Sequence, residues 1–166
     1  MIAVGRLDRH PQFIPTLADA FEREWPGWTR TVSRTYLESI FQNGVEGGLP
    51  IVLAAFEDER VLGTIALRAW FGEDAMGESP WVRQLFVLPE HRGHGIDRLL
   101  GAAIEGEARD LGFPCLYAAT NRIERLLARR GWELYRRIEH DAKPMAWLRK
   151  KTGDRAVSIR RCNGSF

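Results

Sequence analysis

The chain has 166 residues, of which 45% are hydrophobic and 28% are charged, and its formal net charge is +2. This length and composition favour one soluble globular domain with a sizeable core. The near balance of charge gives no argument for a nucleic-acid partner, and no segment reaches the roughly 18 apolar residues of a membrane span.

The cysteine content and the N-terminal sequence indicate the cellular compartment in which the protein is expected. Cys115 and Cys162 are the only cysteines, and their spacing fits no metal site. Two cysteines without a disulfide framework predict reduced thiols in a cytoplasm-like compartment. The first residues contain no long apolar run, so we expect no signal peptide. The expectation is therefore a cytoplasmic protein without a membrane span or a metal site.

The first half of the chain alternates between apolar runs and helical spacing, with Pro and Gly as breakers. Thr31 and Ser33 are alternative caps for the second helix, and Gly63 marks either a bulge or a close backbone approach. The expected elements are a strand at 2–7, a helix at 12–25, a helix that ends by residue 43, and paired strands at 50–56 and 61–69.

The second half of the chain opens with a strand that ends before Pro89, followed by a glycine-containing turn and a helix. Gly112 and Pro114 stop that helix. The expected elements are a strand at 82–88, a helix at 96–111, a strand at 115–119, a helix at 121–130, and a hairpin of strands at 132–140 and 144–150. From Thr152 onward the apolar residues follow neither helical nor strand spacing.

The turn Pro89–Gly95 carries two glycines and leads directly into a helix. Glycine lets the backbone come close to a bulky anion, and the first N–H groups of a helix point outward without an internal partner. The helix dipole favours negative charge at the same place. The arrangement suits a phosphate, although a tight turn that needs positive φ would use the same residue types.

The segment Leu85–Ile96 reads Leu-Phe-Val-x-Pro-x-x-Arg-Gly-x-Gly-Ile. It resembles the acetyl-CoA motif of the GCN5-related N-acetyltransferase (GNAT) family, in which Gln/Arg-x-x-Gly-x-Gly/Ala follows a Val-x-Pro strand end. The resemblance implies an α/β (α+β) fold with a twisted mixed, mostly antiparallel sheet flanked by helices on both faces. It implies a single domain over residues 1–151, and we expect residues 152–166 to be a mobile tail.

The resemblance also implies acetyl-CoA as co-substrate. Pantetheine would pair with the backbone of the strand, and the pyrophosphate would lie on the amides of the turn. The implied coenzyme-binding residues are Leu85, Phe86, Val87, Arg92, Gly93, His94, Gly95, Ile96 and Asp97, with Asn121 as a polar contact after the next strand. A helix N-cap would explain Asn121 equally well.

Two positions depart from the family pattern. Asp97 stands where the pattern has Gly or Ala, and its carboxylate would repel a pyrophosphate unless it points away; Asp in a first helical turn is itself stabilising. Leu127 stands where the family often has a Tyr general acid. We favour transfer in which water or another group protonates the thiolate, because general-acid help is worth only about 10²–10⁴ in rate.

The sequence singles out no catalytic residue. Four acidic residues fall in segments that border the amine site in the family, although most such carboxylates are solvated: Glu24, Glu73, Asp74 and Glu78. Tyr36 and Tyr117 could donate protons, but tyrosines more often anchor packing. Four aromatic residues after the first strand could wall the acceptor site, although core packing is favoured: Trp25, Trp28, Tyr36 and Phe41.

Basic residues concentrate in the C-terminal third, from Arg122 to Lys151. They suit an anionic partner or the 3′-phosphate and adenine end of the coenzyme, while a solvated helix face is the plainer interpretation.

The first hypothesis is an acetyl-CoA-dependent N-acetyltransferase that moves an acetyl group directly to a primary amine of a small molecule or a peptide. A ping-pong route through Cys115 is disfavoured, because this residue lies in an apolar strand without a neighbouring base. The second hypothesis is a non-catalytic acyl-CoA-binding or sensor domain. The third, a basic adaptor that binds nucleic acid through residues 122–161, is disfavoured. The acceptor and the oligomeric state, a homodimer included, stay open.

Overall fold

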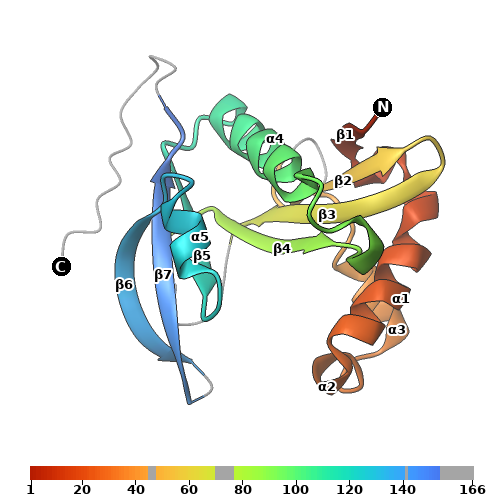
Figure 1. Ribbon diagram of the computed structural model, residues 1–166, viewed down its shortest axis with the longest axis horizontal. Helices are drawn as coiled ribbons and strands as arrows, with labels where there is room; N and C mark the ends of the chain where they lie inside the picture. The colour runs from red at the N-terminus through yellow and green to blue at the C-terminus, as the bar shows by residue number, and fades with distance from the viewer. Residues whose placement is uncertain (45–47, 70–76, 141, 154–166) are drawn as a thin grey trace. The chain divides into compact units, whose positions relative to one another are not determined.

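The computed structural model describes residues 1–44, 48–69, 77–140 and 142–153. Its seven strands form one sheet in the order β1-β2-β3-β4-β5-β7-β6 (Figure 1). The strands are β1 (Ala3–Arg6), β2 (Ile51–Glu57), β3 (Arg60–Arg68), β4 (Trp81–Val87), β5 (Cys115–Thr120), β6 (Glu133–His140) and β7 (Lys143–Lys151). β4 pairs with β5 in parallel, whereas β1–β2, β2–β3, β5–β7 and β6–β7 are antiparallel, which confirms the predicted mixed, mostly antiparallel sheet.

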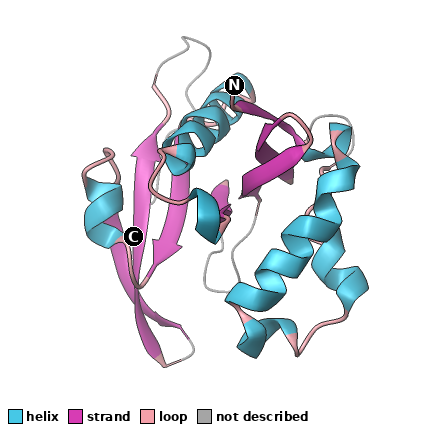
Figure 2. Ribbon diagram, turned by 45° about the vertical axis from the view of Figure 1, so that its right-hand side comes forward, coloured by secondary structure: helices cyan, strands magenta, loops and turns pink. Residues whose placement is uncertain are grey.

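Helices flank this sheet (Figure 2). They are α1 (Ile14–Glu24), α2 (Pro26–Thr29), α3 (Arg34–Ser39), α4 (Ile96–Asp110) and α5 (Glu124–Ala128), with 3₁₀ turns at Leu7–Arg9, Pro11–Phe13 and Pro89–His91. The chain divides into two compact units, residues 1–67 with 83–104 and residues 68–82 with 105–166. β4 and α4 each have residues in both units.

In the first unit, β2 and β3 are buried along almost their whole length, as expected for strands that are covered on both faces. Val52 and Ala54 of β2 belong to a core with Leu17 and Phe21 of α1 and with Leu37 of α3. On β3, a Cβ atom at Gly63 would lie 3.3 Å from Leu100 of α4. The predicted helices α1 and α4 thus cover β2 and β3 through apolar side chains at helical spacing.

The structure decides between the two predicted caps of α3. The Ser33 hydroxyl accepts a hydrogen bond from the backbone N–H of Tyr36 at 3.1 Å, so Ser33 is the N-cap. The helix ends at Ser39, earlier than the predicted limit of residue 43. The Asn43 side chain instead donates to the carbonyl of Val52 at 3.2 Å, which ties this segment to β2.

The helix predicted at 121–130 is also shorter, because α5 begins only at Glu124. The Thr120 hydroxyl accepts hydrogen bonds from the N–H groups of Arg122 and Ile123, both at 3.1 Å. Such side-chain bonds hold the backbone in a turn and delay the start of a helix. A short helix that the sequence analysis did not predict, α2, follows Trp25.

Gly63 lies both at a bulge and at a close backbone approach, the two alternatives that the sequence offered. The register of β2 against β3 shifts between Ala55 and Phe56, opposite Gly63. A Cβ atom at Gly63 would lie 2.6 Å from the backbone oxygen of Phe86, which is closer than real Cβ contacts come. Only glycine lets β3 and β4 approach this closely.

In the second unit, Cys115 is buried in β5 and takes part in a disulfide. The expectation of reduced thiols is therefore wrong for this residue, and the argument from thiols to a cytoplasm-like compartment does not hold. Spacing alone could not reveal the bond, because Cys115 comes from a strand without a framework of further cysteines. Cys162, the other cysteine of the sequence, lies outside the described residues.

Thr152 follows β7 and is fixed to the second unit. It is 4% exposed, its hydroxyl donates to the Phe113 carbonyl at 2.6 Å, and its N–H donates to the Pro114 carbonyl at 3.1 Å. Its own carbonyl accepts from Nε of Arg109 at 2.7 Å. The ordered chain thus continues at least to Thr152, and the expectation of a mobile tail applies to residues that the structure does not describe.

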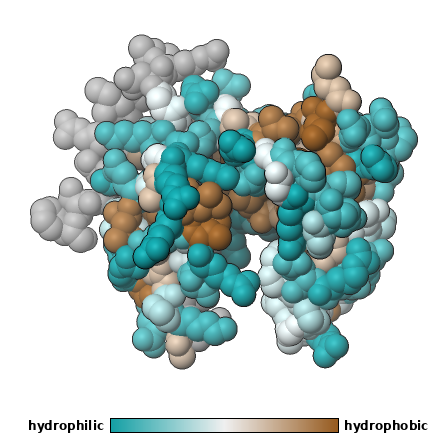
Figure 3. Space-filling model, viewed as in Figure 1, coloured by the Kyte–Doolittle hydropathy of each residue, from teal (hydrophilic) through white to brown (hydrophobic). Residues whose placement is uncertain are grey.

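Hydrophilic residues cover much of the face seen in Figure 3, with hydrophobic residues between them, which is ordinary for a folded chain. Among the described residues, none of the helices combines the length and apolarity that crossing a bilayer requires.

Two alanine substitutions should have opposite effects on stability. Gly101 lies within α4, where an added Cβ meets nothing within 4 Å, so Gly101→Ala should raise the unfolding free energy by about 0.5–1 kcal/mol. Gly63→Ala places Cβ against a backbone oxygen and should cost about 1–3 kcal/mol. Chemical denaturation of both variants tests this, and equal effects would contradict the close approach of β3 and β4.

The anchoring of Thr152 predicts a measurable loss in Thr152→Val. This change keeps the shape but removes the hydroxyl that bonds Phe113, so the unfolding free energy should fall by about 1–2 kcal/mol. Thermal unfolding of this variant should be compared with that of Thr31→Val, whose hydroxyl is exposed and bonds only the nearby Trp28 carbonyl. Equal melting temperatures would show that Thr152 contributes nothing.

Candidate functional site

The turn between β4 and α4 lies entirely in the first unit and has the geometry of an anion site. Gly93 and Gly95 have φ angles of +81° and +77°, which L side chains rarely adopt. When residues with positive φ alternate with residues with negative φ, successive N–H groups converge and form a concave surface of hydrogen-bond donors. α4 follows directly and has 15 residues, long enough for a full dipole.

Backbone donors of the turn are available to a ligand. The N–H of Arg92 donates to the Pro89 carbonyl at 3.3 Å, and the N–H groups of Arg98 and Leu99 donate to the Gly95 carbonyl. Between them, within the described chain, the N–H groups of residues 93–96 donate to no protein acceptor. Four consecutive donors at a helix start can therefore bind an anion.

The Arg92 side chain is turned back onto the protein. Its Nε donates to the Val87 carbonyl at 3.0 Å and its Nη2 pairs with Oε2 of Glu24 at 2.9 Å. The guanidinium also lies over the Phe86 ring, 5.5 Å from its centroid. Arg92 thus links the end of β4 to the end of α1, and its charge is already matched by a carboxylate.

Arg98 is a positive residue of the turn that the sequence analysis missed. Its Nε and Nη2 atoms would lie 3.7 Å from a Cβ atom built on Gly95, so the guanidinium stands beside the glycine. Its neighbour Asp97 is half-buried in the first turn of α4. Arginine is common on exposed helix surfaces, so the sequence alone did not distinguish Arg98 from the other arginines of the chain.

A second missed feature is the backbone at Gln84. Its φ is +56°, an uncommon value for a residue with a side chain, and its amide Nε2 donates to the Ile40 carbonyl at 3.3 Å. Leu85, Phe86 and Val87 follow directly, and Phe86 is 4% exposed within the core. A ligand along this part of β4 would therefore meet backbone rather than the Phe86 side chain.

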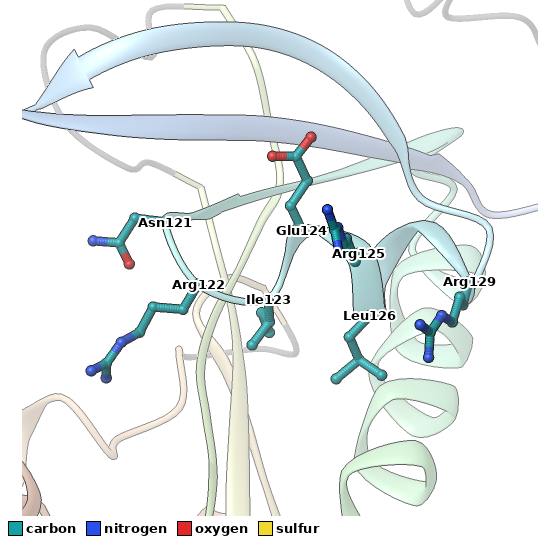
Figure 4. A pocket seen from close by; sticks show the side chains of 7 residues that line it. All are labelled: Asn121, Arg122, Ile123, Glu124, Arg125, Leu126 and Arg129. Atoms are coloured by element: carbon teal, nitrogen blue, oxygen red, sulfur yellow. The ribbon is translucent and has the colours of Figure 1, made fainter.

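Asn121 lies in the second unit, where it lines a cavity of about 460 Å³ with the residues of α5 (Figure 4). The other lining residues are Arg122, Ile123, Glu124, Arg125, Leu126 and Arg129. Ile123 and Leu126 point to one side of the segment, and Glu124 points to the opposite side. Glu124 is held there by two bonds from Arg137, at 2.8 and 3.1 Å.

The acidic candidates have different surroundings. Glu24 is paired with Arg92, and Glu73 and Asp74 lie outside the described residues. Glu78 is the most enclosed of those described: its side chain is 11% exposed, and its Oε1 accepts from the Tyr135 hydroxyl at 2.9 Å. Burial, followed by this hydrogen bond, raises the pKa of Tyr135, so its hydroxyl keeps its proton at neutral pH.

The aromatic candidates after β1 divide into two groups. Phe41 is fully buried beside Phe21, as the core interpretation predicted. Trp25, Trp28 and Tyr36 are exposed, so they are available to a partner. In the second unit, Tyr117 is buried against Trp81 and its pKa is raised mainly by that burial. Leu127 is buried in α5 and packs as an ordinary core residue.

Solved structures share this fold at low sequence identity. An aminoglycoside 6′-N-acetyltransferase complexed with coenzyme A is 16% identical, with a TM-score of 0.74 over 92% of this chain and 98% of that one. The aminoglycoside 6′-N-acetyltransferase from Enterococcus faecium is 17% identical, with a TM-score of 0.73 over 92% of this chain and 98% of that one. The yncA protein of Salmonella typhimurium, solved with acetyl-CoA, is 16% identical, with a TM-score of 0.75 over 96% and 99%.

No curated protein matches the chain by sequence. Residues 14–132, more than half of the chain, match the sequence model of the Acetyltransferase (GNAT) family. The matched range contains α1 and α3, the strands β2 to β5, the glycine turn and α5. The chain belongs to the GNAT acetyltransferase family and is an N-acetyltransferase with acetyl-CoA as its co-substrate.

Proposed function

We propose that this enzyme transfers the acetyl group of acetyl-CoA directly to a primary amine, with the coenzyme pyrophosphate on the turn between β4 and α4. The observation that supports this assignment best is the run of N–H donors at residues 93–96, without acceptors in the described chain. A diphosphate accepts several such bonds at once, and the dipole of α4 adds to them. Positive φ at Gly93 and Gly95 aims the donors outward.

The proposed coenzyme site divides its residues by task. The backbone of Leu85, Phe86 and Val87 pairs with pantetheine, and the amides of Gly93, His94, Gly95 and Ile96 bind the pyrophosphate. Arg92 holds the turn through Val87 and Glu24 instead of meeting the phosphates with its side chain. Arg98 supplies the charge beside Gly95 and offsets the carboxylate of Asp97.

The cavity at Asn121 has a chemistry that suits a nucleotide. In the described chain, Arg122, Arg125 and Arg129 have no ion-pair partner, and Ile123 and Leu126 add apolar surface. Guanidinium groups bind phosphate well, and apolar side chains cover an adenine ring. Coenzyme A carries both groups at its nucleotide end, and we assign Asn121 to the same ligand.

The proposed reaction is a single displacement. The neutral amine nitrogen attacks the thioester carbonyl carbon, so a C–N bond forms and the C–S bond breaks. The nitrogen loses one proton to a base, and the departing thiolate gains one from water. The products are the acetamide and free coenzyme A.

Direct transfer is favoured over a thiol intermediate. Cys115 is 3% exposed and lies in a disulfide, so it offers no thiolate to carry the acetyl group. Because Leu127 cannot donate a proton, thiolate protonation by water costs the enzyme at most the usual factor of about 10²–10⁴ that a general acid provides. A slow but genuine transferase is the expected outcome, and coenzyme binding without any turnover would favour the sensor alternative.

The first test is a thermal melt with and without acetyl-CoA. A ligand at about 100 times its Kd adds roughly 2.7 kcal/mol, which at roughly 2–4 °C per kcal/mol raises Tm by roughly 5–11 °C. Gly95→Ala forces an L residue to positive φ and should weaken coenzyme binding at least about tenfold by calorimetry. Gly101→Ala, the same change within α4, is the matched control, and equal affinities of the two variants would refute the phosphate site.

Asp97→Ala probes the departure from the family pattern. Removal of a negative charge near a pyrophosphate should leave coenzyme affinity equal or tighten it by up to about 1 kcal/mol, roughly fivefold. Asp110→Ala removes the same charge at the far end of α4 and should leave the affinity unchanged. A large loss in Asp97→Ala alone would show that the carboxylate assists binding.

A further inference from the structure

One face of the strands β5, β7 and β6, within the second unit, carries aromatic rings together with both signs of charge. Tyr117 pairs with Arg149, and Trp147 pairs with Arg136, so these four side chains share a face. Trp81 packs edge-on against Trp147, with ring centroids 4.9 Å apart. The rings of Trp81, Tyr117, Tyr135 and Trp147 form a continuous cluster, here called the aromatic face. Trp81 and Trp147 are fully buried in it, so a ligand can meet this face only at the charged side chains beside the rings.

A bulge in β6 sets the order of side chains on the aromatic face. Leu134 pairs with Leu148 and Arg136 pairs with Trp147, so Tyr135 is an extra residue without a partner in β7. In a regular strand, Tyr135 and Arg136 would point to opposite faces. Here the Arg136 guanidinium lies 5.5 Å from the ring centroids of both Tyr135 and Trp147. Bulges re-aim side chains in this way beside functional sites.

Glu78 supplies the negative charge of the same cluster. Its Oε1 accepts the Tyr135 hydroxyl at 2.9 Å and lies 3.7 Å from Nη2 of Arg136, and its backbone carbonyl accepts from the Trp81 indole at 2.8 Å. The pairing with Arg136 is longer than a hydrogen bond, so both groups keep donors and acceptors for a ligand. Two contacts thus hold the carboxylate, both through Oε1, and a third holds the Glu78 backbone.

Two guanidinium groups and two carboxylates meet at this face. The Arg149 guanidinium lies 5.5 Å from the centroid of the Tyr135 ring and pairs at 3.9 Å with the carboxylate of Glu133, which is largely exposed. Such an exposed pair contributes little to stability. The side chains of Arg136 and Arg149 are 47% and 36% exposed, so both guanidinium groups can reach a ligand. Glu78 is the enclosed carboxylate of the two, and the exposed pairing with Glu133 leaves Arg149 open to a ligand carboxylate.

We infer that the aromatic face recognises the acceptor, and that this acceptor is a small amine that also carries a carboxylate, as an amino acid does. The inference rests on the proposed acetyl transfer to an amine. Glu78 binds the amino group, and Arg136 with Arg149 bind the carboxylate, for which guanidinium has matching fork geometry. Tyr135 positions Glu78 and, through its ring, both arginines.

The same charges disfavour a polycation. A second ammonium group would meet guanidinium groups that already occupy the ring faces, and like charges at this range repel. The enclosed carboxylate of Glu78 can balance one ammonium group, and Glu133 is already paired with Arg149. An acceptor with several amines and no acid group is therefore the wrong ligand for this face.

The experiment is thiol release from acetyl-CoA with amines that differ only in the acid group. The probes are each of the common α-amino acids with its C-terminal amide, and 4-aminobutyrate with butylamine and 1,4-diaminobutane. We expect kcat/KM for the acid to exceed that of its amide at least tenfold in the best pair. Equal rates within pairs, a preference for amides or diamines, or no turnover of any pair would overturn the inference.

Variants separate recognition from mere stability. Arg136→Gln should raise KM at least tenfold for the acid of the best pair and leave KM for its amide unchanged. Lys143→Gln removes one positive charge from the first residue of β7 and should change neither. Tyr135→Phe should raise KM for both members alike, because it frees Glu78. An Arg136→Gln effect that is equal on acid and amide would overturn the assignment.

Coenzyme binding distinguishes a failure of this inference from a failure of the proposed function. Glu78→Gln and Arg136→Gln should bind acetyl-CoA with unchanged Kd in calorimetry. If the unaltered enzyme binds no coenzyme, the proposed function fails. If it binds and transfers acetyl without regard to the acid group, only the assignment of the aromatic face fails.

Discussion

The bonds of the Arg92 side chain hold the shape of the turn on which the proposed coenzyme site depends. Nε reaches back five residues to the Val87 carbonyl, and Nη2 reaches the last residue of α1, Glu24. The ion pair is half exposed and contributes at most about 1 kcal/mol, so the bond to the strand end matters more for geometry than for stability. The chain therefore leaves β4 in one direction, and the glycine amides are arranged before any ligand arrives.

Sequence could predict the turn but not the contacts that hold it. Glycine spacing, the strand before Pro89 and the apolar stripe of α4 are local signals, and they predicted the strand, turn and helix with errors of about one residue. The pairing of Arg92 with Glu24 joins residues 68 positions apart, and the Arg98 position above Gly95 depends on a rotamer. Neither contact can be predicted from the spacing of apolar residues along the chain. Helix ends at Ser39 and Glu124 were missed because side chains of Asn43 and Thr120 bind backbone there.

The second unit was harder to foresee for the same reason. A bulge such as that at Tyr135 exists only relative to a partner strand, so β6 alone reads as an ordinary strand. Glu78 stood among several acidic residues, and only the contacts with Tyr135 and Trp81 distinguish it. The disulfide of Cys115 was likewise invisible to an argument from cysteine number. Local pattern thus gave the elements, and long-range contacts gave the chemistry.

The length of β6 decides which of its side chains are neighbours on the sheet. Loss of one residue at the bulge would restore regular alternation and send Tyr135 and Arg136 to opposite faces, while the pairs nearer the strand start would stay in register. The rest of the fold would not need to change, because β6 is the edge strand of the sheet. A single codon deletion in this hairpin is therefore a short evolutionary route to a different set of side chains on this face.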